Sequence, residues 1–144
     1  MKKYLIVLVF AIGVSVAFSC NSSSSQAQAE SVELQEGLIT KNVSAAEFKG
    51  LIAERADAIL LDVRTSNEVA QGAIKNAVNV DFYDGSFKAE LDKLDKSKPV
   101  LIYCRSGRRS GIAMSKMREL GFSEIYNLQG GIIEWANTGQ EVVK

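Results

Sequence analysis

The sequence of 144 residues contains no histidine, only two cysteines and a single proline. Without histidine the chain cannot form a histidine metal site, a Ser-His-Asp triad or a Cys-His protease pair. Two cysteines are too few for a four-thiolate zinc site. Seventeen basic and seventeen acidic residues balance, so no overall field attracts the chain to nucleic acid. We therefore expect no metal, no other cofactor and no nucleic-acid partner.

The sequence also lacks an apolar run of the length that a membrane-spanning helix needs, about 20 residues. Its longest apolar run extends from Tyr4 to Phe18, after Lys2 and Lys3, and is interrupted by Gly13 and Ser15. A charged start, a short apolar segment and small residues after it are typical of a secretory signal peptide. A transmembrane anchor is the less favoured alternative.

The end of the apolar run decides the fate of Cys20. Ser19-Cys20 resembles the lipobox of bacterial lipoproteins, although Ala17 and Phe18 stand where leucine and a small residue are usual. The alternative is cleavage after the A-x-A pattern at 27–29, which would remove Cys20. We favour a signal peptide over 1–19 and a lipidated Cys20, which predicts an exported lipoprotein of the periplasm or cell envelope with a membrane lipid anchor.

Composition divides the remainder of the chain into two parts. Residues 20–37 are rich in Ser, Gln, Glu and Ala and have little to bury, so we expect a flexible tether. Residues 38–144 have the length of one domain. In either cleavage scheme Cys104 has no structural disulfide partner.

Strands and helices alternate along the predicted domain. The capping box Ser44–Glu47 predicts a helix over 45–54, and a buried strand over 58–61 ends at Asp62. We further predict a short helix capped by Ser66, strands over 77–80, 100–103 and 125–128, and helices over 87–94, over 110–120 and through Trp135. This order favours an α/β fold with a central parallel sheet and helices on both faces.

Cys104 follows the predicted buried strand 100–103 directly. In open α/β sheets ligands bind beyond the carboxyl ends of the strands. Three arginines (Arg105, Arg108 and Arg109), the backbone N–H groups of a tight loop and the N-terminus of the next helix should all favour the thiolate. We therefore expect a nucleophilic cysteine that needs no histidine. The alternative is an inert buried thiol, which three adjacent arginines disfavour.

Several segments together resemble a single rhodanese domain over nearly all of 38–144. They are Asp62-Val63-Arg64, Glu68 followed by 72–77, Tyr103 to Ser110, and Leu128 to Ile132 with Trp135. The resemblance implies a rhodanese-like fold and a sulfurtransferase in which Cys104 accepts sulfur as a persulfide. It also implies that the loop and helix start cradle the sulfur, through Arg105, Ser106, Gly107, Arg108, Arg109 and Ser110.

The sequence departs from the family pattern Gly-His-Ile-x-Gly-Ala at two positions. Ala73 stands for the histidine and Asn76 for the second glycine. We expect a packing consequence, because that histidine is neither nucleophile nor base in sulfur transfer. We expect Asp62 and Arg64 to support the sheet end as an ion pair.

The resemblance implies a small sulfur donor such as thiosulfate and a cyanide or thiol acceptor, with a protein acceptor also open. Two other functions remain. Phosphatases and arsenate reductases use Cys-x5-Arg, whereas here Ser110 occupies that arginine position and Arg109 comes one residue earlier. A noncatalytic rhodanese-like binding module is the third possibility.

The lipoprotein hypothesis predicts that wild type incorporates radiolabelled palmitate and that Cys20→Ser does not, because the thiol is the acylated group. Equal absence of label in both proteins would refute the anchor. Cleavage after Ala29 predicts instead a mature chain that starts at Glu30, which intact-mass measurement distinguishes.

Overall fold

The computed structural model describes residues 37–144, so the predicted signal peptide, Cys20 and all but the last residue of the predicted tether lie outside the described residues. Strands and helices alternate along the chain as predicted. The elements are β1 (Ile39–Val43), α1 (Ala45–Glu54), β2 (Ile59–Asp62), α2 (Ser66–Val69), β3 (Val78–Asn79), α3 (Phe87–Asp92), β4 (Val100–Tyr103), α4 (Arg108–Glu119), β5 (Glu124–Leu128) and α5 (Gly131–Asn137). Among these helices none is long and apolar enough to span a membrane.

The five strands form one parallel sheet in the order β1-β5-β4-β2-β3. Strand β4 lies at its centre, between β5 and β2, and all four of its residues are buried. A parallel strand covered on both faces has this continuous apolar character. The α/β prediction with a central parallel sheet is therefore confirmed.

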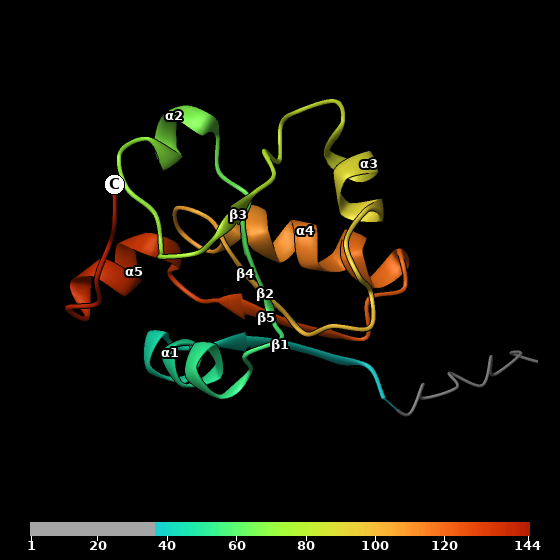
Figure 1. Cartoon of the computed structure of the whole chain (residues 1–144), viewed down its shortest axis with the longest axis horizontal. Helices are drawn as coiled ribbons and strands as arrows, with labels where there is room; N and C mark the ends of the chain where they lie inside the picture. The colour runs from blue at the N-terminus through green and yellow to red at the C-terminus, as the bar shows by residue number, and fades with distance from the viewer. Residues whose placement is uncertain (1–36) are drawn as a thin grey trace, which may run out of the picture. The chain divides into compact units, whose positions relative to one another are not determined.

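Two apolar cores cover the two faces of the sheet, because alternate residues of each strand point to opposite sides. In β4, Leu101 belongs to the core that includes Phe48 of α1 and Trp135 of α5. Ile102 belongs to the core that includes Met117 of α4 and Leu91 of α3. Figure 1 shows α1 on one side of the sheet and α3 and α4 on the other. The sheet is thus held between two helical layers.

Strand β1 was not predicted from the sequence. It is an edge strand that pairs only with β5, and of its five residues only Val43 is buried. An edge strand has one pairing partner and needs few apolar side chains, so the apolar pattern used for the other strands is absent.

Two helix starts differ from the predictions. Helix α4 begins at Arg108, two residues before the predicted Ser110, because Gly107 adopts a left-handed φ of 87° and caps it. Helix α2 is capped by Thr65, not by Ser66, and it ends at Val69, before Gly72. The Thr65 hydroxyl accepts from the Glu68 N–H, while the Glu68 side chain accepts from the Thr65 N–H. Both helices therefore begin closer to the end of the preceding strand than expected.

Asn76 explains one departure from the family pattern. Its φ is 67°, in the left-handed region, and its side chain is exposed. Glycine enters this region freely, and asparagine enters it more readily than other residues with a Cβ. Asn76 thus keeps the turn that glycine would form.

We predict that Asn76→Val lowers the free energy of unfolding by about 1–2 kcal/mol, the cost of a left-handed residue with a bulky Cβ. Asn76→Gly should stay within about 1 kcal/mol of wild type. Urea unfolding measures both, and Lys75→Val is the matched control at the neighbouring exposed position. Equal losses in Asn76→Val and Lys75→Val would contradict the backbone explanation.

Candidate active site

The site lies in the loop between β4 and α4, at the carboxyl end of the central strand. Cys104 follows Tyr103 and is the only free cysteine among residues 37–144. The loop then turns through Ser106 and Gly107 into α4. Because Cys104 directly follows the last residue of β4, its thiol lies at the carboxyl edge of the sheet, where open α/β folds bind ligands.

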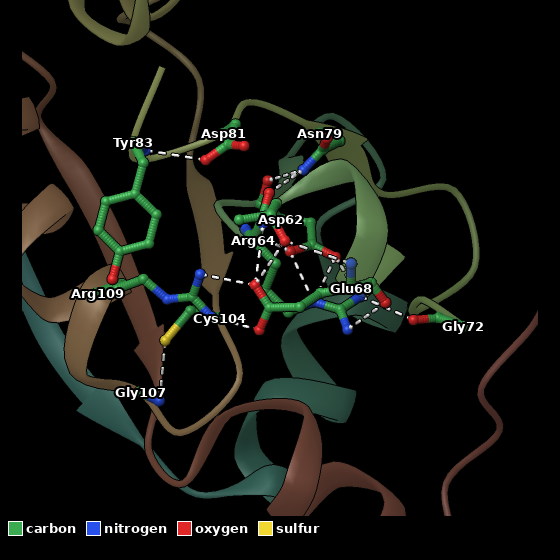
Figure 2. Close-up of polar contacts among 11 residues, drawn as sticks. Asp62, Arg64, Glu68, Gly72, Asn79, Asp81, Tyr83, Cys104, Gly107 and Arg109 are labelled. Atoms are coloured by element: carbon green, nitrogen blue, oxygen red, sulfur yellow. Dashed lines mark hydrogen bonds and ion pairs between the residues drawn. The ribbon is translucent and has the colours of Figure 1, made fainter. Parts of the chain in front are cut away.

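Backbone N–H groups of this loop point at the sulfur. The Gly107 N–H donates to Cys104 Sγ at 3.2 Å (Figure 2). The positive φ of Gly107 makes this turn possible, and a Cβ there would lie 3.0 Å from the Leu128 carbonyl oxygen. A glycine is therefore required both for the backbone conformation and for the close packing against the end of β5.

These donors lower the pKa of the Cys104 thiol. Burial raises it, because the residue is only 1% exposed, but the nearby donors outweigh burial, namely the Ser110 hydroxyl and the backbone N–H groups of Ser110, Ser106 and Gly107. The Ser110 hydroxyl is fully buried, and no hydrogen bond satisfies it among residues 37–144. It is thus free to donate to the thiolate.

The three arginines differ in their surroundings. Arg105 and Arg108 are exposed, at the rim of the loop. Arg109 is held by Glu68 in a two-pronged ion pair, with Nη1–Oε2 and Nη2–Oε1 distances of 2.8 and 2.6 Å. Its guanidinium also lies 5.5 Å from the centre of the Tyr83 ring. Arg109 therefore differs from the other two arginines in being paired with a carboxylate as well as lying near Cys104.

Sequence reasoning did not assign Glu68 or Tyr83 to the site. The signal available for Glu68 was the capping box Thr65-x-x-Glu68, which fixes this carboxylate at the start of α2. Its partner Arg109 lies 41 residues away along the chain. No local pattern predicts that contact or the stacking of Tyr83.

Asp62 and Arg64 form the ion pair expected at the end of β2. Arg64 Nη2 lies 2.6 Å from Asp62 Oδ2, and the two side chains are 5% and 1% exposed. Arg64 also donates to the carbonyl oxygens of Glu68 and Gly72, at 3.2 and 2.8 Å (Figure 2). The pair therefore anchors the segment from Glu68 to Gly72 at both of its ends.

Helix α5 supports the loop from the other side. The N–H groups of Ile132 and Ile133 donate to the carbonyls of Cys104 and Arg105, at 2.9 and 3.2 Å. A Cβ on Gly131 would lie 2.5 Å from the Cys104 carbonyl oxygen. Glycine at this position therefore lets α5 approach the loop closely enough to hold it.

A family model for the rhodanese-like domain matches residues 44–138. The chain belongs to the rhodanese-like domain family. The match includes the strands and helices that surround Cys104 and ends just before the C-terminal segment.

Relatives with this domain have different names. A protein of Allochromatium vinosum named a sulfurtransferase is 37% identical over 105 residues, covering 73% of this chain and 96% of the relative. A tRNA uridine(34) hydroxylase of Cytophaga hutchinsonii is 39% identical over 98 residues, covering 66% of this chain but 31% of that protein. The crystal structure of a rhodanese-related protein from Thermoplasma volcanium has a TM-score of 0.64 and 27% identity, covering 72% of this chain and 98% of that one.

The C-terminal segment fills the surroundings of Ala73, where this rhodanese-like domain lacks the usual histidine. Ala73 exchanges two backbone hydrogen bonds with Val143, at 2.8 and 2.9 Å. The adjacent Gly72 has no room for a Cβ, which would meet Val142 at 2.6 Å. Alanine in place of the usual histidine at position 73 therefore occurs where Val142 and Val143 pack closely against the chain.

Among residues 37–144 no cluster of three or more histidine, cysteine or carboxylate side chains is placed to hold a metal ion. The chemistry that the described site offers is that of a single activated thiol inside a ring of donors.

We predict that Cys104 alkylation has a pH midpoint below the free-cysteine value of about 8.5. Ser110→Ala should raise the midpoint, because the thiolate loses a hydrogen-bond donor, while the exposed Ser115→Ala on the same helix should not. Measurement of alkylation rate against pH tests this. A wild-type midpoint at or above about 8.5 would refute it.

Proposed function

We propose that this rhodanese-like domain is a sulfurtransferase that carries sulfane sulfur on Cys104. The observation that carries the proposal is the short loop that directs backbone N–H groups at Sγ. Such donors stabilise the thiolate before transfer and the terminal sulfur of a persulfide after it. The relative named a sulfurtransferase, aligned over 96% of its length, supports the same chemistry.

The proposed reaction has two balanced steps. The Cys104 thiolate attacks the outer sulfur of thiosulfate or of a persulfide, a new S–S bond forms, and sulfite or a thiolate leaves with the electron pair. A cyanide or thiol acceptor, free or on a protein, then attacks the terminal sulfur and releases the Cys104 thiolate. No external oxidant or reductant is needed. Covalent storage between two half-reactions predicts ping-pong kinetics.

Arg109 argues against phosphoryl transfer at this loop. In Cys-x5-Arg enzymes the arginine clamps the oxyanion with two parallel N–H groups. Here the two terminal nitrogens of Arg109 already bind the two oxygens of Glu68. The arginine next to the Cys-x5-Arg position therefore has no free fork to offer a phosphate.

We also propose that the domain works at the cell envelope, outside the cytoplasm, tethered through Cys20. The support comes from the first 37 residues of the sequence, and the palmitate experiment tests it. A sulfurtransferase there would receive small donors and pass sulfur to acceptors of the same compartment.

The proposal predicts that thiosulfate or a persulfide adds one sulfur atom to wild type and that Cys104→Ser gains none, because a hydroxyl neither attacks sulfane sulfur nor holds it. Intact-mass spectrometry measures the adduct. Cys20→Ser is the matched control and should still gain sulfur.

Arg105→Ala or Arg108→Ala should mainly raise the thiosulfate KM, because these exposed cations attract the dianion. Aryl-phosphate hydrolysis should stay at background in every variant. Ready hydrolysis of aryl phosphates by wild type, without any sulfur adduct, would overturn the proposal in favour of a phosphatase.

A further inference from the structure

Glu68 binds the terminal N–H groups of Arg109 that an anionic ligand would otherwise use. A guanidinium offers its paired terminal N–H groups as a fork that matches carboxylate, sulfate or phosphate oxygens. Both terminal nitrogens face the Glu68 carboxylate, at 2.6 and 2.8 Å. Figure 2 shows the Arg109 side chain passing the Cys104 sulfur to reach Glu68, with the Tyr83 ring beside it. The Arg109 cation, which interacts electrostatically with Cys104, is thus engaged inside the protein.

The carboxylate that engages Arg109 is itself fixed in place. Glu68 Oε2 accepts from the N–H and the hydroxyl of Thr65, at 3.1 and 3.0 Å. Arg64 holds the Glu68 carbonyl oxygen at 3.2 Å. These contacts anchor Glu68 to a rigid helix start and to the buried pair at the end of β2. The carboxylate therefore cannot swing aside without breaking the cap of α2.

The pair is nevertheless within reach of an incoming ligand. The side chains of Arg109 and Glu68 are 15% and 25% exposed. Glu68 lines a hollow beside the loop together with Arg105, Gln71 and Ile133. Arg105 lines this hollow and Arg109 does not, so an anion at the rim meets the exposed Arg105 while the Arg109 fork stays covered by the Glu68 carboxylate. The pKa of Glu68 is lowered to about 2, mainly by its hydrogen bond to Arg109, so the carboxylate is charged at neutral pH.

We propose that Glu68 is a specificity-determining positioning residue, a built-in carboxylate ligand of Arg109 that competes with oxyanions at the Cys104 loop. It disfavours dianionic donors such as thiosulfate relative to persulfides, which carry sulfane sulfur without a sulfonate. The preference among donors rests on the proposed function. The competition with oxyanions does not, since it concerns binding beside an unreacted thiol.

The test compares Glu68→Gln with wild type. Glutamine keeps the shape of the side chain and can still complete the capping box at Thr65, but it removes the charge that neutralises Arg109. The matched control is Glu47→Gln, which alters the equivalent capping-box residue of α1, where Glu47 pairs with Ser44. Both substitutions remove one negative charge from the start of a helix, and only one of them touches Arg109.

The first measurement is protection of Cys104 from alkylation by inorganic phosphate or sulfate. In Glu68→Gln the half-protecting concentration should fall about tenfold or more, the effect of a freed charge-assisted hydrogen bond. Glu47→Gln should behave as wild type. The gain should disappear in Glu68→Gln/Arg109→Ala, because the freed guanidinium is then gone. Unchanged protection in Glu68→Gln, or a gain that survives loss of Arg109, would overturn the inference.

The second measurement is the ratio of thiosulfate KM to glutathione persulfide KM. This ratio should fall about tenfold in Glu68→Gln, since only in thiosulfate is an oxyanion group bonded directly to the sulfur that Cys104 attacks. An unchanged ratio would reject the role in donor choice. If wild type gains no sulfur from either donor, the proposed function fails, while the alkylation assay still decides whether Glu68 excludes oxyanions.

Glu68→Asp provides a second variant should Glu68→Gln not fold. Aspartate keeps the charge but is one methylene shorter, so it cannot reach both Thr65 and the fork of Arg109 as glutamate does. Oxyanion protection should improve, by less than in Glu68→Gln. No improvement in a folded Glu68→Asp protein would count against the fork as the site of competition.

Discussion

The site depends on one constraint, which is that the backbone around Cys104 must close tightly enough to direct N–H groups at a buried sulfur. A thiol with 1% exposure would ordinarily stay protonated, because burial disfavours its charged form. Hydrogen bonds from the loop and from Ser110 reverse that preference and lower its pKa. Two glycines make the closure possible. Gly107 turns the loop by adopting a left-handed backbone conformation. Gly131 lets α5 contact the backbone carbonyl groups of Cys104 and Arg105.

Electrostatics at the site follow a division between fixed and free charges. The Asp62–Arg64 pair is buried and holds the carbonyl oxygens of Glu68, within α2, and of Gly72, after it, so it positions Glu68 without facing solvent. Glu68 in turn neutralises Arg109. Only Arg105 and Arg108 present exposed charge at the rim. The thiolate is therefore stabilised mainly by local dipoles, while Arg105 and Arg108, at the rim of the loop, remain unpaired within residues 37–144.

The departures from the family pattern are absorbed by the fold. Asn76 adopts the left-handed conformation that the usual glycine would take. At Ala73 the missing histidine coincides with a backbone bridge to Val143, outside the region that the family model matches. Both changes leave the Cys104 loop and its supporting helix intact, so the family resemblance carried by the loop is retained.

The sequence by itself determined the α/β class, the helix layers, most element positions and the place of Cys104 at the end of the central strand. Those features depend on local signals: the apolar run of β4, capping residues, and glycine next to arginine in a short loop. Strand β1 escaped prediction because an edge strand buries little. Only the tertiary structure decided that Arg109 pairs with Glu68, that Tyr83 stacks on it and that Gly131 supports the loop. Each of these joins segments far apart in the chain, and such contacts depend on how the elements pack, which no local pattern of residues encodes.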